Sequence, residues 1–363
     1  MKPTARAVTF HGPGRDLETI EFALPQLQEG EVLVKVSCST LCGSDLHTYH
    51  GDRGTPCPTI LGHEILGVVA ELPADAAVLD HFGMPLEIGA RVTWGIAASC
   101  GDCFFCRHEL PQKCATLFKY GHQQITDAHP LSGGMAEYCH LAAGTPVFRV
   151  PESLPDTVAC PANCATATVA AALRVAGQHS EGTLLIHGAG MLGLTAAAMA
   201  RWQGYREVIV IDVNPQRLSR ATEFGATHVV AAGETDSSLD DTVEATTAGR
   251  GVDVAIDVSG APAAMRQGME ALRVGGCAVW VGAVFPTPPV EVIPEQVVRK
   301  MIEIRGLHNY APRDLATALD FLNQTQSDYP FSGLIGDSYP LDDAEAAFAA
   351  AHESGAFRVM LRP

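Results

Sequence analysis

Long apolar runs are missing from this sequence of 363 residues. The most apolar long stretch, residues 184–200, is interrupted by His187 and by glycines, and it fits a strand, a turn and a helix. A membrane-spanning helix needs about 20 predominantly apolar residues, so we expect no membrane span. The first residues, MKPTARAVTFHGPGRDLETIEF, hold no apolar core of signal-peptide length. We therefore expect a cytoplasmic protein.

Basic residues are scarce. Lys and Arg total 24 against 41 Asp and Glu, which gives a formal net charge of −17. Such an acidic surface repels phosphate backbones, so we expect no nucleic-acid partner. The net charge does not exclude an anionic small-molecule substrate, because a small ligand responds to the local field of its binding site. The sequence also shows no internal repeat and no low-complexity segment.

An odd count of eleven cysteines argues against a fully paired set of disulfides. In a cytoplasmic chain, clustered cysteines more often bind metal or carry out chemistry. Cys100, Cys103 and Cys106 are spaced by three residues around one small loop, and Cys114 follows eight residues later. Four thiolates with no open position predict a structural zinc site. Free thiols in a loop, or an iron–sulfur cluster, are the alternatives.

A second group of possible metal ligands lies nearer the start of the chain. Residues 41–47 read LCGSDLH, and residues 62–64 read GHE. The thiol of Cys42 and the imidazole of His63 both suit zinc, and a catalytic zinc needs three protein ligands and one open position. The third ligand must come from elsewhere, and we choose Cys164 in PANCATAT. Taken alone, each short motif is weak, because a lone Cys or His more often belongs to the core or the surface.

A glycine-rich motif, GAGMLG at residues 188–193, follows the apolar strand expected at 183–187 and opens a helix. Its glycines let the backbone approach a pyrophosphate, whose charge the helix N-terminus stabilises. Asp212 ends the next strand, where a carboxylate can bind a ribose diol and would repel a 2′-phosphate. The motif therefore predicts a dinucleotide site that prefers NAD to NADP, and a glycine-rich turn without a ligand is the alternative. The cofactor contacts expected from the motif are Gly188, Gly190, Met191, Leu192 and Gly193.

The sequence changes character near residue 165. Before it, short alternating runs such as 31–37 and 64–70 indicate an irregular, mostly β domain. After it, apolar runs alternate with helical patterns, which predicts a doubly wound parallel sheet. The expected strands of this sheet are 183–187, 208–212, 228–231, 253–258, 278–282 and 302–307. Further expected elements are helices over 215–224, 313–323 and 341–353, and a final strand over 357–361.

The motifs LCGSDLH, LGHE, CGDCFFC with its later Cys, and HGAGMLG resemble, in this order and spacing, the zinc-containing medium-chain dehydrogenase family. The resemblance covers essentially the whole chain. It implies an α/β protein in which residues 1–165 and 307–363 form a GroES-like, mainly β catalytic domain with a structural zinc lobe at about 100–114. Residues 166–306 then form a Rossmann NAD-binding domain. It further implies an alcohol dehydrogenase with two zinc ions per chain, assembled as a homodimer or homotetramer.

The resemblance also assigns roles to single residues. Ser44 and His47 match the hydroxyl and the imidazole that pass the substrate proton to solvent, and Asp45 and Glu64 match the carboxylates close behind the catalytic zinc. The catalytic zinc ligands match Cys42, His63 and Cys164, and the structural ones match Cys100, Cys103, Cys106 and Cys114. Arg217 and Arg358 lie where the family contacts the adenosine side and the pyrophosphate of the cofactor.

Three side chains that can carry positive charge are candidates for binding the substrate. The segments TPCPTILGHE, SCGDCFFCRHELPQKC, KYGH and GLHNYAPRDL resemble a bacterial branch associated with phosphonate catabolism. Arg53, Lys119 and His308 occupy positions where the family usually places apolar pocket walls. Because Arg binds phosphonate oxygens in a bidentate fork and Lys adds a point charge, they predict a small anionic alcohol or aldehyde as substrate. Alternatively, these side chains point to solvent.

Three other functions stay open at this stage. A polyol or amino-alcohol dehydrogenase of the same family would act on a neutral substrate. A zinc-free reductase of activated double bonds would not need Cys42 and His63, and a non-catalytic binding protein would not need the proton relay. A stretch between Val69 and Val92, longer than in common relatives, has no functional interpretation.

Overall fold

The protein divides into two compact units in the structure, a computed structural model that describes residues 3–233, 237–353 and 356–363. Unit 1 comprises Met1–Cys164, Ala311–Gln326 and Phe331–Pro363, and unit 2 comprises Ala165–Tyr310 and Ser327–Pro330. Within the described ranges, no single helix is long and apolar enough to cross a membrane. One bent pair, Asp156–Asn163 with Ala165–Ala176, passes that test by length and composition only.

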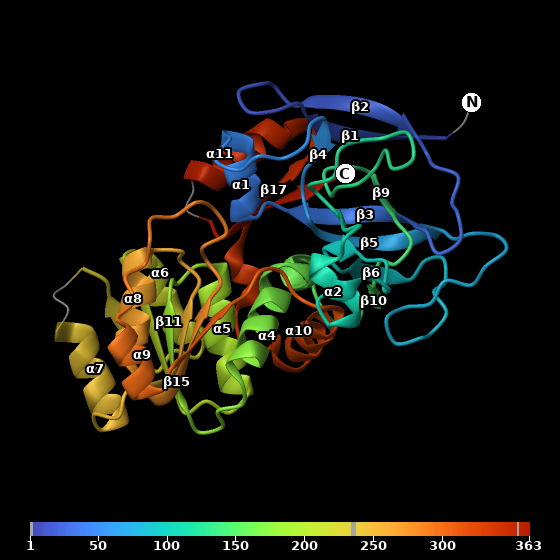
Figure 1. The fold of residues 1–363 in the computed structure, drawn as a ribbon. Helices are drawn as coiled ribbons and strands as arrows, with labels where there is room; N and C mark the ends of the chain where they lie inside the picture. Colours follow the sequence, from blue (N-terminus) through green and yellow to red (C-terminus); the bar gives the residue numbers. More distant parts are fainter. Residues whose placement is uncertain (1–2, 234–236, 354–355) are drawn as a thin grey trace. The chain divides into compact units, whose positions relative to one another are not determined.

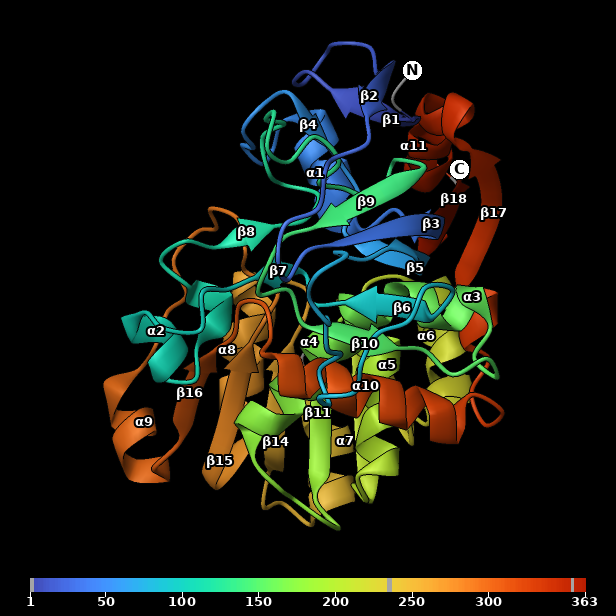
Figure 2. The same ribbon diagram turned by 90° about the vertical axis from the view of Figure 1, so that its right-hand side faces the viewer.

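Unit 1 is built mainly from β-strands. Its largest sheet runs in the order β10-β6-β5-β3-β18-β17, with β9 also paired to β3 (Figure 2). Smaller sheets have the orders β2-β1-β4 and β7-β8. The strands are β1 (Thr4–Phe10), β2 (Glu18–Ala23), β3 (Val32–Thr40), β4 (Thr59–Ile60), β5 (Glu64–Glu71), β6 (Arg91–Trp94), β7 (Ala97–Ala98), β8 (Phe118–Lys119), β9 (Tyr138–Leu141), β10 (Val147–Arg149), β17 (Ile335–Pro340) and β18 (Arg358–Arg362).

The central strand β3 brings distant parts of unit 1 together. It pairs antiparallel with β5, with β9 and with β18 near the end of the chain, where Met360 lies opposite Thr40. Most of its residues are buried, as expected for a strand with packed neighbours on both faces. The helices of unit 1 are α1 (Gly43–His50), α2 (Phe104–Arg107), α3 (Asp156–Ala159), α10 (Pro312–Thr325) and α11 (Ala344–Glu353), with 3-10 turns η1 (Pro111–Lys113), η2 (Cys160–Asn163), η4 (Phe331–Leu334) and η5 (Leu341–Asp343).

Unit 2 is a parallel sheet with the strand order β13-β12-β11-β14-β15-β16. This is the 3-2-1-4-5-6 order of a Rossmann fold. The strands are β11 (Thr183–His187), β12 (Glu207–Asp212), β13 (His228–Ala231), β14 (Val252–Asp257), β15 (Leu272–Trp280) and β16 (Glu303–Gly306). The helices are α4 (Ala165–Ala176), α5 (Met191–Trp202), α6 (Pro215–Ala221), α7 (Ser237–Thr247), α8 (Pro262–Glu270) and α9 (Pro294–Lys300), with 3-10 turn η3 (Thr222–Phe224). Helices α4 and α5 lie on one face of the sheet, and α7 and α8 on the other (Figure 1).

The expected Rossmann sheet is confirmed, with corrections to its elements. Strand β15 begins at Leu272, six positions before the expected start at residue 278, because Gly275 and Gly276 in this segment resemble a turn in sequence. The helix expected over 215–224 ends as a 3-10 turn before Gly225, whose φ of 89° closes it. Its N-terminus is capped by the Asn214 side chain.

The long stretch between β5 and β6 folds back on itself. The buried Asp80 accepts hydrogen bonds from the backbone N–H groups of Phe82 (2.9 Å) and Met84 (3.0 Å) through Oδ1. Its Oδ2 lies 3.3 Å from Nε of Arg149 on β10. Asp80 therefore organises this segment and fastens it to the edge of the main sheet.

The turn from β11 to α5 is the place where the fold most needs glycine. A Cβ atom on Gly193 would lie 1.7 Å from the carbonyl oxygen of Gly188, and Gly188 itself has a φ of +106°. Gly190, two residues later, has an ordinary φ of −76°, and a Cβ there would meet nothing within 4 Å. The close approach of helix and strand therefore depends on Gly193, whereas Gly190 has room for a side chain.

These two glycines give a matched test of the fold. We expect Gly193→Ala to lower the free energy of unfolding by about 1–3 kcal/mol or more, because overpacking forces the backbone apart. Gly190→Ala should change it by much less. Thermal and denaturant unfolding of the two variants measure this difference, and equal losses in both would contradict the packing argument.

Candidate active site

Four cysteines form a compact cluster in unit 1, as their spacing predicts. Four of the sulfur–sulfur distances among Cys100, Cys103, Cys106 and Cys114 range from 3.4 to 4.0 Å. Sulfurs at about 2.3 Å from a tetrahedral zinc lie about 3.8 Å apart, whereas a disulfide would bring two of them to about 2.0 Å. All eleven cysteines are free thiols. The geometry fits one closed tetrahedral site.

Backbone N–H groups point at these sulfurs. Cys100 N donates to Cys114 Sγ at 3.3 Å, Cys103 N to Cys100 Sγ at 3.4 Å, and Ala115 N to Cys103 Sγ at 3.5 Å. Burial raises the pKa of Cys114, but the hydrogen bond from Cys100 and those involving Thr116 outweigh it and lower that pKa to about 6. The loop is therefore organised to hold thiolate charge, which a structural metal requires.

A second cluster lies in unit 1, where the interior strand β3 ends and the neighbouring strand β5 begins. Potential ligand atoms of Cys42, His63, Glu64 and Cys164 all lie within 4.8 Å of one another. Cys42 caps the N-terminus of α1, His63 and Glu64 lie at the start of β5, and Cys164 follows η2. The Sγ atom of Cys164 is 3.4 Å from Nε2 of His63. The structure thus brings together the side chains that sequence motifs placed in three separate segments.

Asp45 and Ser44 fix the orientation of His63. Oδ1 of Asp45 lies 3.2 Å from Nδ1 of His63, while its Oδ2 accepts a hydrogen bond from Cys42 N at 2.9 Å. Nδ1 is thereby engaged, and Nε2 faces Cys164 and the hydroxyl of Ser44, which lies 3.5 Å away. A carboxylate behind a ligating imidazole is the arrangement that sets the tautomer in metal sites. Nε2 is therefore the atom free to bind a cation.

The carboxylate of Glu64 lies in the cluster but is already bound by other side chains. Its carboxylate accepts two hydrogen bonds from Arg358, at 2.7 and 2.8 Å, and one from Thr40 Oγ1 at 2.6 Å. Nη2 of Arg358 also lies 3.5 Å from Cys42 Sγ. Arg358, assigned from sequence to the cofactor pyrophosphate, is only 6% exposed and is engaged at this cluster. Its contact with a pyrophosphate stays a prediction.

Cys160 lies near the cluster in sequence but does not join it. Its thiol donates to the carbonyl oxygens of Cys38 (3.6 Å) and Glu64 (3.4 Å) in the core of the sheet. Burial raises the pKa of Cys160 well above its ordinary value. It is thus a buried neutral thiol, and the geometry favours Cys164 as the third sulfur or nitrogen ligand.

The electrostatics of the cluster favour thiolate at Cys42. The hydrogen bond from Cys164, and then the charge of Arg358, lower the pKa of Cys42 well below its ordinary value, although burial acts the other way. Burial disfavours protonation of His63, but Asp45 outweighs it and raises the pKa of His63 to about 10. Because ligands must be deprotonated, a cation entering this cluster displaces the His63 proton.

Arg53 and Lys119 lie close to the cluster. Burial is the main cause of a lowered pKa in both side chains. It lowers the pKa of Arg53, and together with the nearby charge of Arg53 it lowers the pKa of Lys119 to about 8. The charges of Asp45 and Cys164 act on both side chains. Nη1 of Arg53 is 3.4 Å from Nε2 of His122. These cations belong to the same unit as the metal cluster, are only partly exposed, and lie within its electric field.

His122 is a site residue that the sequence analysis missed. Its ring lies 5.2 Å from that of His63, centroid to centroid. The segment KYGH contains it, but nothing in its spacing relates it to the metal motifs. The predicted partner His308 belongs to unit 2, so its role stays a prediction. His47, the outer member of the predicted relay, is exposed on α1 and lies 3.0 Å from Asp52.

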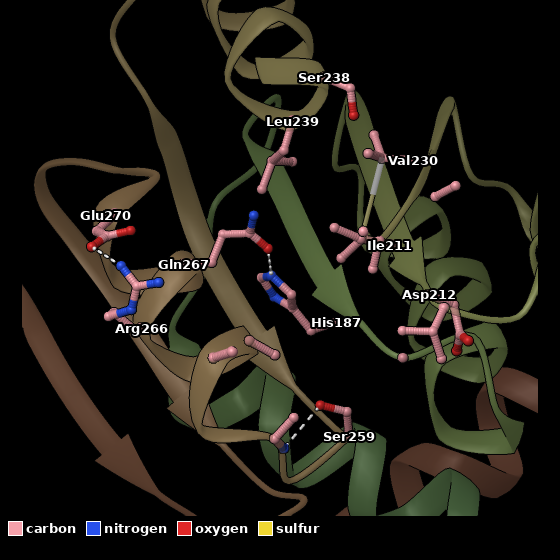
Figure 3. Close-up of a pocket in the computed structure, with 18 of the residues that line it drawn as sticks. His187, Ile211, Asp212, Val230, Ser238, Leu239, Ser259, Arg266, Gln267 and Glu270 are labelled. Atoms are coloured by element: carbon pink, nitrogen blue, oxygen red, sulfur yellow. Dashed lines mark hydrogen bonds and ion pairs between the residues drawn. The ribbon is translucent and has the colours of Figure 1, made fainter. Parts of the chain in front are cut away.

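Unit 2 holds a pocket of about 480 Å³ at the carboxyl ends of its strands (Figure 3). Its walls include Gly188 of the glycine motif, Asp212 after β12, and the loops after β13 and β14. In doubly wound sheets ligands bind outside the carboxyl ends of the strands. The pocket therefore fits the adenosine half of a dinucleotide.

Asp212 is held in place by the glycine turn. It is 9% exposed, and its two oxygens accept hydrogen bonds from Ala189 N (2.5 Å) and Asn214 N (2.7 Å). Each oxygen keeps a lone pair for a ribose hydroxyl. Arg217 is exposed on α6 and does not line the described pocket. Its assignment to the adenosine side stays a prediction.

Sequence reasoning also missed a polar pair in this pocket. His187, at the end of β11, is buried and lies 3.2 Å from Oε1 of Gln267 on α8 (Figure 3). Burial lowers the pKa of His187 to about 4, so the ring is neutral and Nε2 donates to the Gln267 oxygen. This pair ties α8 to the central strand beneath the nucleotide pocket.

The two cysteine clusters should respond differently to the same substitution. We expect Cys103→Ser and Cys42→Ser each to hold one zinc fewer than the parent chain. Cys103→Ser should also lower the melting temperature, because a closed site contributes folding energy. Cys42→Ser should keep the fold and lose activity.

Elemental analysis and thermal unfolding measure both effects. Cys160→Ser is the control, since its thiol contacts backbone carbonyls and should leave the metal content unchanged. The account would be wrong if Cys42→Ser retained the full zinc content of the parent.

Comparisons with known proteins agree with this architecture. A family model for the alcohol dehydrogenase GroES-like domain matches residues 28–152, and one for zinc-binding dehydrogenases matches residues 192–324. An alcohol dehydrogenase structure from Thermotoga maritima is 29% identical with a TM-score of 0.93, covering 99% of this chain and 100% of that one. A short chain alcohol dehydrogenase from E. coli, complexed with NADH, is 26% identical with a TM-score of 0.83, and 99% of each chain is covered.

A relative in sequence is L-threonine 3-dehydrogenase from Chelativorans sp. strain BNC1. It is 29% identical over 99% of both chains. Both family models, the cysteine clusters and the Rossmann pocket point to an oxidoreductase that uses zinc and a nicotinamide cofactor. The chain therefore belongs to the zinc-dependent medium-chain alcohol dehydrogenase family.

Proposed function

We propose that this protein transfers a hydride between NAD(H) and a small anionic alcohol or aldehyde, with a phosphonate-bearing substrate favoured. The observation that carries the proposal is the pair of half-buried cations, Arg53 and Lys119, beside the metal cluster. The buried cluster and the dinucleotide pocket support the dehydrogenase chemistry, and the cations support the class of substrate.

The catalytic zinc is assigned to Cys42, His63 and Cys164. Two thiolates and one imidazole leave one coordination position open, and the remaining carboxylate, Glu64, is already bound by Arg358. The structural zinc is assigned to the four-cysteine cluster. When bound, the catalytic zinc supplies a Lewis acid that lowers the pKa of a substrate hydroxyl, and the nicotinamide accepts the hydride.

Residues of α1 provide the route for the substrate proton. The Ser44 hydroxyl lies beside Nε2 of His63 at 3.5 Å and can accept a proton at the cluster. His47 lies one helical turn further on the same helix and is exposed. Its Nδ1 lies 3.0 Å from Oδ2 of Asp52, at the exposed end of this route.

The cations beside the cluster select an anion. Arg53 and Lys119 repel each other, which contributes to the low pKa of Lys119. A neutral alcohol would leave both charges without a partner in a partly buried wall, and burying an unpaired charge is costly. A phosphonate carries three oxygens, which can accept a bidentate pair from Arg53 and a further bond from Lys119.

An amino-alcohol dehydrogenase is the second candidate, because the threonine dehydrogenase above is similar over nearly all of this chain. L-Threonine carries a carboxylate that Arg53 could bind. Its ammonium group would lie near two further cations, which disfavours it relative to a substrate with negative charge only. Comparing a hydroxyalkyl-phosphonate with L-threonine separates the two.

Cofactor preference tests the role of Asp212. We expect the parent enzyme to use NAD in preference to NADP. Asp212→Ala should weaken NAD about tenfold or more, because charge-assisted hydrogen bonds contribute about 1.5–3 kcal/mol, and it should relieve repulsion of the 2′-phosphate. Asp212→Asn, which keeps an acceptor for the Ala189 N–H group, should improve NADP relative to NAD with less damage to the turn. Similar kcat/KM for both cofactors in the parent would contradict the assignment.

Substrate charge tests the role of Arg53. We expect Arg53→Ala to raise KM for a hydroxyalkyl-phosphonate by about tenfold or more, while KM for a neutral alcohol of the same length hardly changes. Arg53→Lys should give an intermediate value, because the charge remains but the fork is lost. Arg15→Ala, a surface control, should change neither.

Steady-state NADH absorbance gives all of these constants. If the parent turned over neutral alcohols as efficiently as the phosphonate, the anionic substrate would be excluded, and the zinc-dependent dehydrogenase activity would stand without it.

A further inference from the structure

A third group of metal-binding side chains lies in unit 1, apart from both cysteine clusters. Glu31 precedes β3, His140 lies on the neighbouring strand β9, and His129 lies in the loop that leads to β9. The potential ligand atoms of the three side chains lie within 4.8 Å of one another. The rings of His129 and His140 are 5.0 Å apart, centroid to centroid.

Several buried ring nitrogens of the two histidines in this group have no hydrogen-bond partner among the described residues. His140 is only 1% exposed, and neither of its ring nitrogens has an aligned hydrogen-bond partner among the described residues. The same holds for Nδ1 of His129. A buried polar group without a partner costs about 1–3 kcal/mol. A ligand bound to these ring nitrogens would remove that cost.

The contact between His140 and Glu31 has the separation expected of two ligands on one ion. Nε2 of His140 lies 3.0 Å from Oε2 of Glu31, without the alignment of a hydrogen bond. Nitrogen and oxygen ligands at about 2.0–2.1 Å from a tetrahedral zinc lie about 3.3 Å apart. The Gln28 N–H group also donates to Oε2 at 2.8 Å, which holds the Glu31 carboxylate in place.

The charge state of the group suits a cation. Burial lowers the pKa of His140 below its ordinary value, and this outweighs the effect of Glu31, which raises it. This shift favours the neutral ring, which is the form that binds a metal. Two imidazoles and one carboxylate are a ligand set that binds zinc with one position open.

We propose that Glu31, His129 and His140 form a third divalent-cation site, of the zinc class. Occupation would tie the loop between β8 and β9 to the main sheet. The same loop follows Lys119 and contains His122, whose ring lies 5.2 Å from His63. A cation at this site would thus hold the wall of the catalytic cluster in place, whichever substrate that cluster serves.

The test is a zinc titration of the full-length protein, followed by native mass spectrometry. After dialysis that leaves the thiolate-bound ions, added Zn²⁺ should bind as one further ion per chain. Glu31→Gln and His129→Asn should weaken this ion by at least about tenfold. His11→Asn, which alters a surface histidine–glutamate pair, should bind it as the parent does.

A second measurement on the parent avoids any effect of the variants on folding. Co²⁺ added to the zinc-loaded protein should produce the weak visible bands of nitrogen and oxygen ligation, without strong thiolate-to-cobalt charge transfer. The proposal would be overturned by a parent chain that binds no further ion, by variants that bind it as tightly as the parent, or by thiolate charge transfer.

Discussion

The balance of charge in the buried cluster around Cys42 is the constraint on which the rest of the site depends. When zinc is bound, the thiolates of Cys42 and Cys164 and the carboxylates of Asp45 and Glu64 bring four negative charges into a region where none of them is well exposed. One zinc ion and Arg358 supply three positive charges. Removing ions from water costs several kcal/mol each, so the opposite charges in this region stabilise one another.

This constraint explains why the end of the chain returns to the first half. Strand β18 pairs with β3 near Thr40, and this pairing delivers Arg358 to Glu64 and Cys42. The guanidinium forms a bidentate ion pair with Glu64, and this geometry is stronger than a single contact. We propose that this ion pair keeps Glu64 out of the metal's coordination sphere and leaves the third ligand position to Cys164.

The four negative and three positive charges leave one net negative charge, and two nearby cations offset it. Arg53 and Lys119 lie within the field of Asp45 and Cys164, yet among the described residues neither lies within 4.0 Å of a carboxylate oxygen. They stabilise the cluster and still have donors for an incoming anion. The electrostatic arrangement that holds the metal ligands therefore also defines the class of substrate that we propose.

Short local motifs in the sequence were enough to predict several parts of the fold and the site. The glycine motif predicted the turn before α5, because steric demands at Gly193 leave one choice of residue. Thiol spacing predicted the four-cysteine cluster for the same kind of local reason. Arg358, His122 and the Glu31–His129–His140 group escaped prediction, or were assigned elsewhere, because their partners are brought together only by pairing of strands far apart in sequence. The start of β15 was wrong because a strand that contains Gly275 and Gly276 looks like a turn.

The most direct test of the central claim is anomalous diffraction at the zinc edge from crystals of the zinc-loaded protein. The account predicts a peak about 2.3 Å from the Sγ atoms of Cys42 and Cys164 and about 2.0–2.1 Å from Nε2 of His63, with Glu64 still paired to Arg358. A zinc ion bound by Glu64 in place of Cys164, or no zinc at this cluster in an active enzyme, would contradict it.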